Sequence, residues 1–149
     1  MSVLERIRNA LLNPAWVCFT WAGLTIGVSL LATPARFAAE TITRPVALDV
    51  GRVVFATLNK VEMGALVALL VVVRLSGRSR NLWAWCSALA LIVVAQGVWL
   101  IPELSARTDI VVAGGTPPPS AAHAIYSTLE LFKIGLLTVL GLRLLGERA

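Results

Sequence analysis

The stretch RVVFATLNKVEMGAL, residues 52–66, decides the fold expected for this chain of 149 residues. It is apolar enough for a membrane-spanning helix, yet Arg52, Asn59 and Glu62 recur at spacings of seven and three residues. That spacing places all three side chains on one face of an α-helix. Because ionisable groups at membrane depth cost several kcal/mol without partners or water, such a stripe predicts a functional site.

A second stretch, HAIYSTLELFKIGLL at residues 123–137, aligns with the first without gaps and carries a matching stripe. The polar residues of this second stripe are His123, Tyr126, Glu130 and Lys133. The identical positions are Thr57/Thr128, Leu58/Leu129, Gly64/Gly135 and Leu66/Leu137. Upstream, the pairs Cys18/Cys86 and Pro34/Pro102 are separated by one common offset. The alignment favours two repeated helical hairpins, with Gly64 and Gly135 at close helix approaches.

The composition is that of an integral membrane protein. Hydrophobic residues make up 58% of the chain and charged residues only 14%, which leaves too little polar surface for a soluble globule. Four apolar runs are long enough to cross a bilayer core of about 30 Å. These runs are Ala15 to Thr33, Val53 to Val73, Leu82 to Ile101 and Ala121 to Leu142. We therefore expect an all-α, four-helix membrane bundle that forms a single domain over residues 1–149.

The distribution of basic residues predicts the orientation and argues against a nucleic-acid partner. The net charge is +5, but the Lys and Arg residues form no dense stripe with interleaved aromatics. In a four-pass layout seven arginines fall on one side: Arg6, Arg8, Arg74, Arg78, Arg80, Arg143 and Arg148. Three fall on the other: Arg36, Arg44 and Arg107. The positive-inside rule then places both termini in the cytoplasm of an inner or plasma membrane protein, with loops 34–51 and 102–120 facing outward.

Cofactor chemistry finds little support in the residue types. Cys18 and Cys86 are expected to be buried free thiols, because no Cys-x-x-Cys or neighbouring His supports a metal or redox site. His123 is the only histidine, so bis-histidine haem ligation is excluded, and we expect no metal and no cofactor. The five Trp residues are interpreted as interfacial anchors, and Ser120 as the N-cap of the last helix.

The two stripes leave several interpretations open. Glu62 and Lys133 are expected to form a buried ion pair. One hypothesis treats the polar groups as contacts that specify which helices meet. The other is an intramembrane polar cavity, lined by Arg52, Asn59, Glu62, His123, Tyr126, Glu130 and Lys133, that binds or passes a small or lipid-like molecule. A proton relay along His123, Glu130 and Glu62 is a special case of the second.

Short motifs resemble two families. A Pro-x-x-Phe turn at Pro34–Phe37, the entry Gly-Arg-Val-x-Phe-x-x-Leu-Asn to the second helix and a lone His opening the fourth resemble the transmembrane-protein-205-like domain-of-unknown-function group. That resemblance implies a four-helix membrane protein without a settled activity. Residues 52–62 also resemble the helix-two signature of the membrane-associated eicosanoid and glutathione enzymes, which implies a glutathione-dependent transferase. Phe55 and Thr57 replace the Arg and His of that signature, which counts against the enzyme.

The residues thus favour a non-enzymatic binding or passage role. The second hypothesis is an accessory subunit or assembly factor, whose stripes are satisfied by another membrane chain. A homo-oligomer is a separate partner hypothesis. The third functional hypothesis is the glutathione-dependent transferase. An accessory subunit is expected to be unstable alone, whereas a binding protein is stabilised by its ligand.

Overall fold

The computed structural model describes residues 13–75 and 81–146, and the regular structure in these two ranges is entirely helical. In chain order the elements are α2 (Pro14–Thr25), η1 (Ile26–Ala32), α3 (Thr33–Ala38), α4 (Arg44–Leu75), α5 (Asn81–Ala95), η2 (Gln96–Leu100), α6 (Ile101–Val112) and α7 (Ala122–Gly146). The two elements η1 and η2 are π-helical turns. The all-helical prediction is confirmed.

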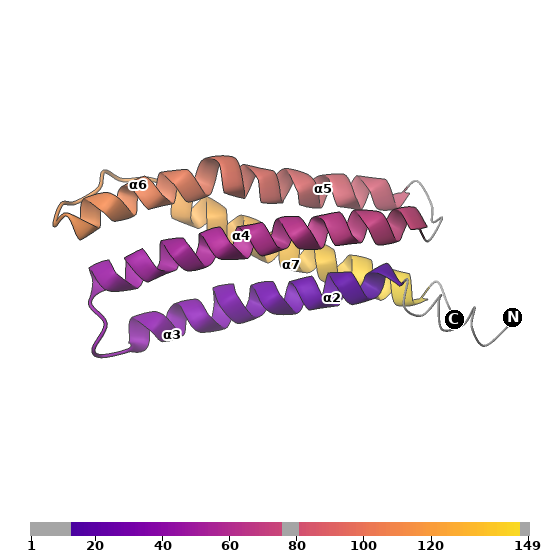
Figure 1. Ribbon diagram of the computed structural model, residues 1–149, viewed down its shortest axis with the longest axis horizontal. Coiled ribbons are helices and arrows are strands. Elements are labelled where there is room, and N and C mark those ends of the chain that lie inside the picture. The colour runs from indigo at the N-terminus through magenta and orange to yellow at the C-terminus, as the bar shows by residue number, and fades with distance from the viewer. Residues whose placement is uncertain (1–12, 76–80, 147–149) are drawn as a thin grey trace, which may run out of the picture.

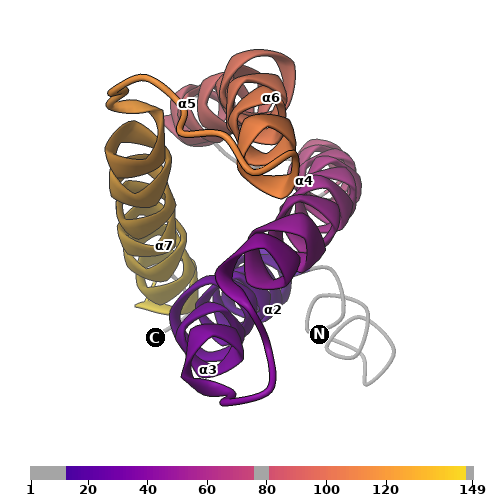
Figure 2. The ribbon, with the colours of Figure 1, turned by 90° about the vertical axis from the view of Figure 1, so that its left-hand side faces the viewer.

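The elements join into four rods that pack side by side (Figure 1). The first rod is α2, η1 and α3, the second is α4, the third is α5, η2 and α6, and the fourth is α7. Each rod packs against the next along the chain, and α7 closes the ring by packing against α2 (Figure 2). Among the described helices, the first three rods are long and apolar enough to cross a membrane, and α7 is not among them.

The helices continue past Pro34 and Pro102, the first residues of the two expected outward loops. Pro34 lies in the first turn of α3 and Pro102 in the first turn of α6. In the first and the third rod a π-turn precedes the proline. The backbone N–H of Thr33 donates to Val28 O, and the backbone N–H of Ile101 donates to Gln96 O. Proline removes one hydrogen bond of an α-helix and crowds the preceding turn, and a π-turn widens the helix at that point. The expected loops 34–51 and 102–120 are therefore largely helical, and only residues 39–43 and 113–121 connect the rods there.

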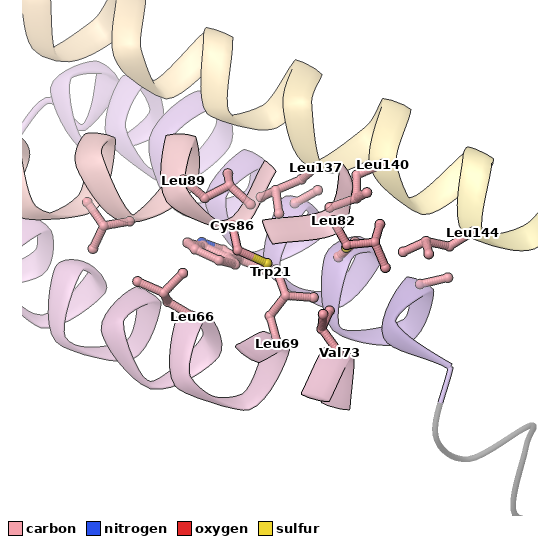
Figure 3. Close-up of a cluster of buried hydrophobic side chains, with 14 residues drawn as sticks. Trp21, Leu66, Leu69, Val73, Leu82, Cys86, Leu89, Leu137, Leu140 and Leu144 are labelled. Carbon is pink, nitrogen blue, oxygen red and sulfur yellow. The ribbon is translucent and has the colours of Figure 1, made fainter. Parts of the chain in front are cut away.

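A hydrophobic core fills the space between the rods at the end where α2 begins and α7 ends (Figure 3). Trp21 of α2, Leu69 of α4, Leu89 of α5 and Leu137 of α7 are each at most 1% exposed. Both cysteines belong to this core as buried free thiols, as predicted. The Ser120 hydroxyl accepts a hydrogen bond from the Ala122 N–H at 3.1 Å, so Ser120 does cap the fourth helix, but from two residues before the first residue of α7.

The close helix approaches lie at other glycines than the two expected. A Cβ atom at Gly64 or Gly135 would meet nothing within 4 Å, so neither glycine is needed for contact. The close approaches are at Gly51, Gly97 and Gly141, where a Cβ would lie under 3.0 Å from a side chain of another rod. The alignment found identical glycines, but an identity within a helix does not reveal which face meets a neighbour.

Gly97→Ala is expected to destabilise the protein by about 1–3 kcal/mol. The added Cβ would lie 2.5 Å from Asn59 Oδ1, and Asn59 is held by a 3.0 Å hydrogen bond from its Nδ2 to Val93 O. Reversible unfolding in mixed micelles measures the change. Gly64→Ala is the matched control, expected to be neutral or slightly stabilising because alanine favours a helix. Equal stabilities of the two variants would contradict the close approach.

Five of the arginines on which the predicted orientation depends lie outside the described residues. They are Arg6, Arg8, Arg78, Arg80 and Arg148. Arg74 and Arg143 are described, in the last turns of α4 and α7. The orientation stays a prediction.

Candidate functional site

Three charged side chains meet in the interior, halfway along the rods. Glu62 of α4 and Lys133 of α7 are fully buried, and Glu130 of α7 is 2% exposed. We call Glu62, Glu130 and Lys133 the ion cluster. Charged groups are rarely buried unless paired, and here the stripes on the two helices face each other.

The Lys133 ammonium uses all three of its protons. Its Nζ lies 2.6 Å from Glu62 Oε1 and 2.6 Å from Glu130 Oε1, and donates to Gln96 Oε1 at 2.9 Å. The predicted Glu62–Lys133 pair is thus confirmed. Because an ammonium group has three donors, Lys133 has none left for a ligand in this arrangement.

Polar groups on two further rods complete the shell of the carboxylates. Glu130 accepts hydrogen bonds from Gln96 Nε2 at 2.8 Å and from the Ser29 hydroxyl at 2.6 Å. Glu62 Oε1 accepts from Trp21 Nε1 and Thr25 Oγ1, both at 3.0 Å. All four rods therefore contribute to the ion cluster or its shell, which fixes their relative register. Glu62 Oε2 is buried and makes no hydrogen bond.

Asn59 and Tyr126 are buried near the ion cluster but do not join it. Asn59 is 6% exposed and donates to a backbone carbonyl of α5. Tyr126 is 2% exposed, its ring meets Phe55 edge to face at 5.2 Å between centroids, and its hydroxyl has no partner. These two predicted ligand residues thus lie between the ion cluster and the end of the molecule where α3 and α6 lie.

A cavity of about 90 Å³ opens at that end of the molecule. Two residues of the predicted stripes line it, Arg52 of α4 and His123 of α7. We call it the outer pocket. Its other lining residues are Thr33, Arg36, Phe37, Leu48, Gly51, Phe55, Ile101, Leu104 and Thr108. The wall is thus mostly apolar, with cationic or ionisable groups at a few points.

The Arg52 side chain is held by carboxylates from two rods. Its Nη2 lies 2.6 Å from Asp49 Oδ1, one turn earlier on α4, and its Nη1 pairs with Asp109 of α6. The side chain is about one third exposed. His123 is exposed, and among the described residues no hydrogen bond links it to Glu130 or Glu62. The hydrogen bonds among the described residues therefore form no proton relay from His123 to the ion cluster.

The structure thus divides the seven predicted site residues into three groups. Arg52 and His123 line the outer pocket, Glu62 and Glu130 both bind Lys133, and Asn59 and Tyr126 lie between these two groups. Within residues 13–75 and 81–146, no group of three or more His, Cys, Asp or Glu side chains is arranged to hold a metal ion.

Sequence reasoning missed several members of the site. Gln96 and Thr25 belong to the ion cluster's shell, and the signal available for each was a polar residue inside an apolar run. Trp21 was interpreted as an interfacial anchor. That interpretation is wrong, because Trp21 is 1% exposed and donates to Glu62. Arg36 was counted only for orientation, yet it lines the outer pocket.

Comparisons with protein-family models, curated proteins and solved structures returned no match for this chain.

Proposed function

We propose that this chain is an integral membrane protein of four spans that binds or passes a small or lipid-like molecule at a polar site between α4 and α7. Membrane insertion is supported by the distribution of polarity, because charged side chains are buried and large apolar side chains are exposed. Glu62 and Lys133 are fully buried, whereas Leu91 and Val98 are 73% and 75% exposed. Large exposed apolar surface is rare on soluble monomers but normal for a surface that faces lipid.

The spacing of charges along α4 matches the thickness of a bilayer. Arg52 and Arg74 are 22 residues apart, which corresponds to about 33 Å of helix, close to the roughly 30 Å of a hydrocarbon core. Of the two charged residues between them, Glu62 faces the interior and Lys60 is exposed. We place α7 in the membrane as the fourth span because its Glu130 and Lys133 are also turned inward.

The two hairpins share a detail that supports their interpretation as repeats. The first contains a π-turn just before Pro34, and the second contains one just before Pro102. These are the two prolines that the sequence alignment pairs. A π-turn is rare and often found at functional sites, so its recurrence at matching positions favours a duplicated hairpin.

The outer pocket is the single observation that carries the binding function. It places Arg52 and His123, one residue from each stripe, at the wall of one cavity. A mostly apolar cavity with a few polar groups is the usual form of a small-molecule site. The ion cluster lies deeper, where it balances charge and links α4 to α7 across the interior.

One argument for the accessory-subunit alternative is weakened. It required that another membrane chain satisfy the stripes, but the partners of Lys133 all belong to this chain. It stays an outcome of the experiment, as does the glutathione-dependent transferase.

Native mass spectrometry of the protein, released in neutral detergent from its own membrane, tests the binding function. We expect a retained small molecule whose occupancy falls in His123→Ala and is unchanged in Ser127→Ala, an exposed control one turn further along α7. Retained glutathione would favour the transferase. A bare chain, or one in stoichiometric complex with another membrane protein, would contradict a binding role.

Membrane insertion has its own test. The full chain is expected to stay in the membrane pellet after alkaline carbonate extraction, and tags on both termini to be protected from protease outside intact cells. Release into the supernatant would contradict insertion, and cleavage of either tag would contradict the orientation.

A further inference from the structure

Arg36 has a special position in the outer pocket. It lies on α3, the short helix that follows the π-turn and Pro34, and its guanidinium sits over Gly51 of α4. A Cβ atom at Gly51 would lie 2.6 Å from Arg36 Nη2 and 2.9 Å from Nη1. Only glycine at position 51 leaves room for the guanidinium in this place. We call this position of the Arg36 guanidinium against Gly51 its seat.

Arg36 has no carboxylate partner among the described residues. Arg52 is paired with Asp49 and Asp109, whereas none of the ion pairs among the described residues includes Arg36. Its guanidinium carbon lies 5.0 Å from the centroid of the Phe37 ring. Its Nε is buried and makes no hydrogen bond. Arg36 thus contributes to the pocket wall a cation that has no ion-pair partner among the described residues.

The size and depth of the pocket restrict what this cation can bind. A cavity of about 150 Å³ holds a benzene molecule, so about 90 Å³ accommodates a head group or a few methylenes but no whole lipid. Arg52, at the same wall, lies at one end of the segment of α4 between Arg52 and Arg74, which we propose to span the membrane. In the membrane placement proposed above, the pocket therefore lies near the level of the lipid head groups.

We propose that Arg36 binds the anionic head group, a carboxylate or phosphate monoester, of a single-chain amphiphile whose first methylenes occupy the outer pocket. A guanidinium offers two parallel donors that match both anions. The apolar residues Phe37, Phe55 and Leu104 line the space for the start of the tail. This inference rests on the proposed function and names its ligand class.

The test uses the full chain in a neutral maltoside detergent and measures binding by titration calorimetry. The probes are palmitate and hexadecyl phosphate, with hexadecyltrimethylammonium as the cationic counterpart and inorganic phosphate and acetate as head groups without tails. We expect the two anionic amphiphiles to bind and the cationic one not to bind. Inorganic phosphate or acetate binding as tightly as the amphiphiles would overturn the amphiphile in favour of a free small anion.

Two variants test Arg36 in different ways. Arg36→Gln removes the charge, and Gly51→Ala keeps it but displaces the guanidinium from its seat. Both are expected to weaken palmitate binding by about tenfold or more, the effect of losing a charge-assisted contact. Arg44→Gln removes an exposed arginine at the same end of the molecule and is expected to leave binding unchanged. Thermal unfolding of each variant checks that the fold is retained.

The outcomes separate this inference from the proposed function. Equal binding of anionic and cationic amphiphiles, lost on His123→Ala, would overturn the role of Arg36 but leave a lipid-like ligand in the pocket. Equal loss of binding in Arg36→Gln and Arg44→Gln would reduce the effect to general charge and overturn the inference. Failure of every probe to bind, together with a bare chain in native mass spectrometry, would overturn both proposals.

Discussion

Lys133→Met is expected to lower the free energy of unfolding by about 3–5 kcal/mol, the usual effect of removing one partner from a buried ion pair. Methionine fills a similar volume, so packing changes little. The variant leaves Glu62 and Glu130 buried as two carboxylates without a cation between them, and Gln96 Oε1 without its donor. Titration with a denaturing detergent in mixed micelles measures the change.

Two further variants show whether this loss comes from the ion cluster. Lys60→Met removes an exposed lysine from α4, two residues before Glu62, and is expected not to destabilise the protein. Adding Glu62→Gln to Lys133→Met is expected to recover part of the lost stability, because one buried charge is then removed with its partner. A destabilisation by Lys60→Met equal to that by Lys133→Met would show that the ion cluster has no special role.

Trp21→Ala is expected to lower the free energy of unfolding by about 3–5 kcal/mol. Trp21 is 1% exposed and lies in the core between α2 and its neighbours (Figure 3). Its Nε1 donates to Glu62 Oε1 at 3.0 Å. Alanine removes the packing of the whole ring and the hydrogen bond together. The same unfolding titration measures the loss.

Trp21→Phe separates the two contributions. Phenylalanine keeps much of the ring but not the N–H, so a smaller loss of about 1–2 kcal/mol is expected. Trp99→Ala is the control, since Trp99 is 56% exposed and its replacement is expected to change stability little. If Trp99→Ala cost as much as Trp21→Ala, the interpretation of Trp21 as a core residue rather than an interfacial anchor would fail.

The helical architecture could be read from the sequence because it depends on local properties. Apolar runs of about 20 residues, separated by short polar segments, predict helices whatever they pack against. The spacing of Glu62 on one helix and Lys133 on another was enough to predict their pair, because two charges of opposite sign in apolar helices each need a partner. The helix ends were less well predicted, since a proline commonly stops a helix but a π-turn can carry the chain past it.

The tertiary structure alone decided which residues share a site. In the folded chain Trp21 points inward and donates to Glu62, and Gln96 and Ser29 donate hydrogen bonds to the ion cluster. Arg52 and His123 lie at the outer pocket, apart from the deeper members of their stripes. The tertiary structure also places Arg36 over Gly51 at the outer pocket. Helical periodicity fixes which residues lie on one face of one helix, but the rotation and register between helices depend on side-chain packing among all four rods, which no single segment contains.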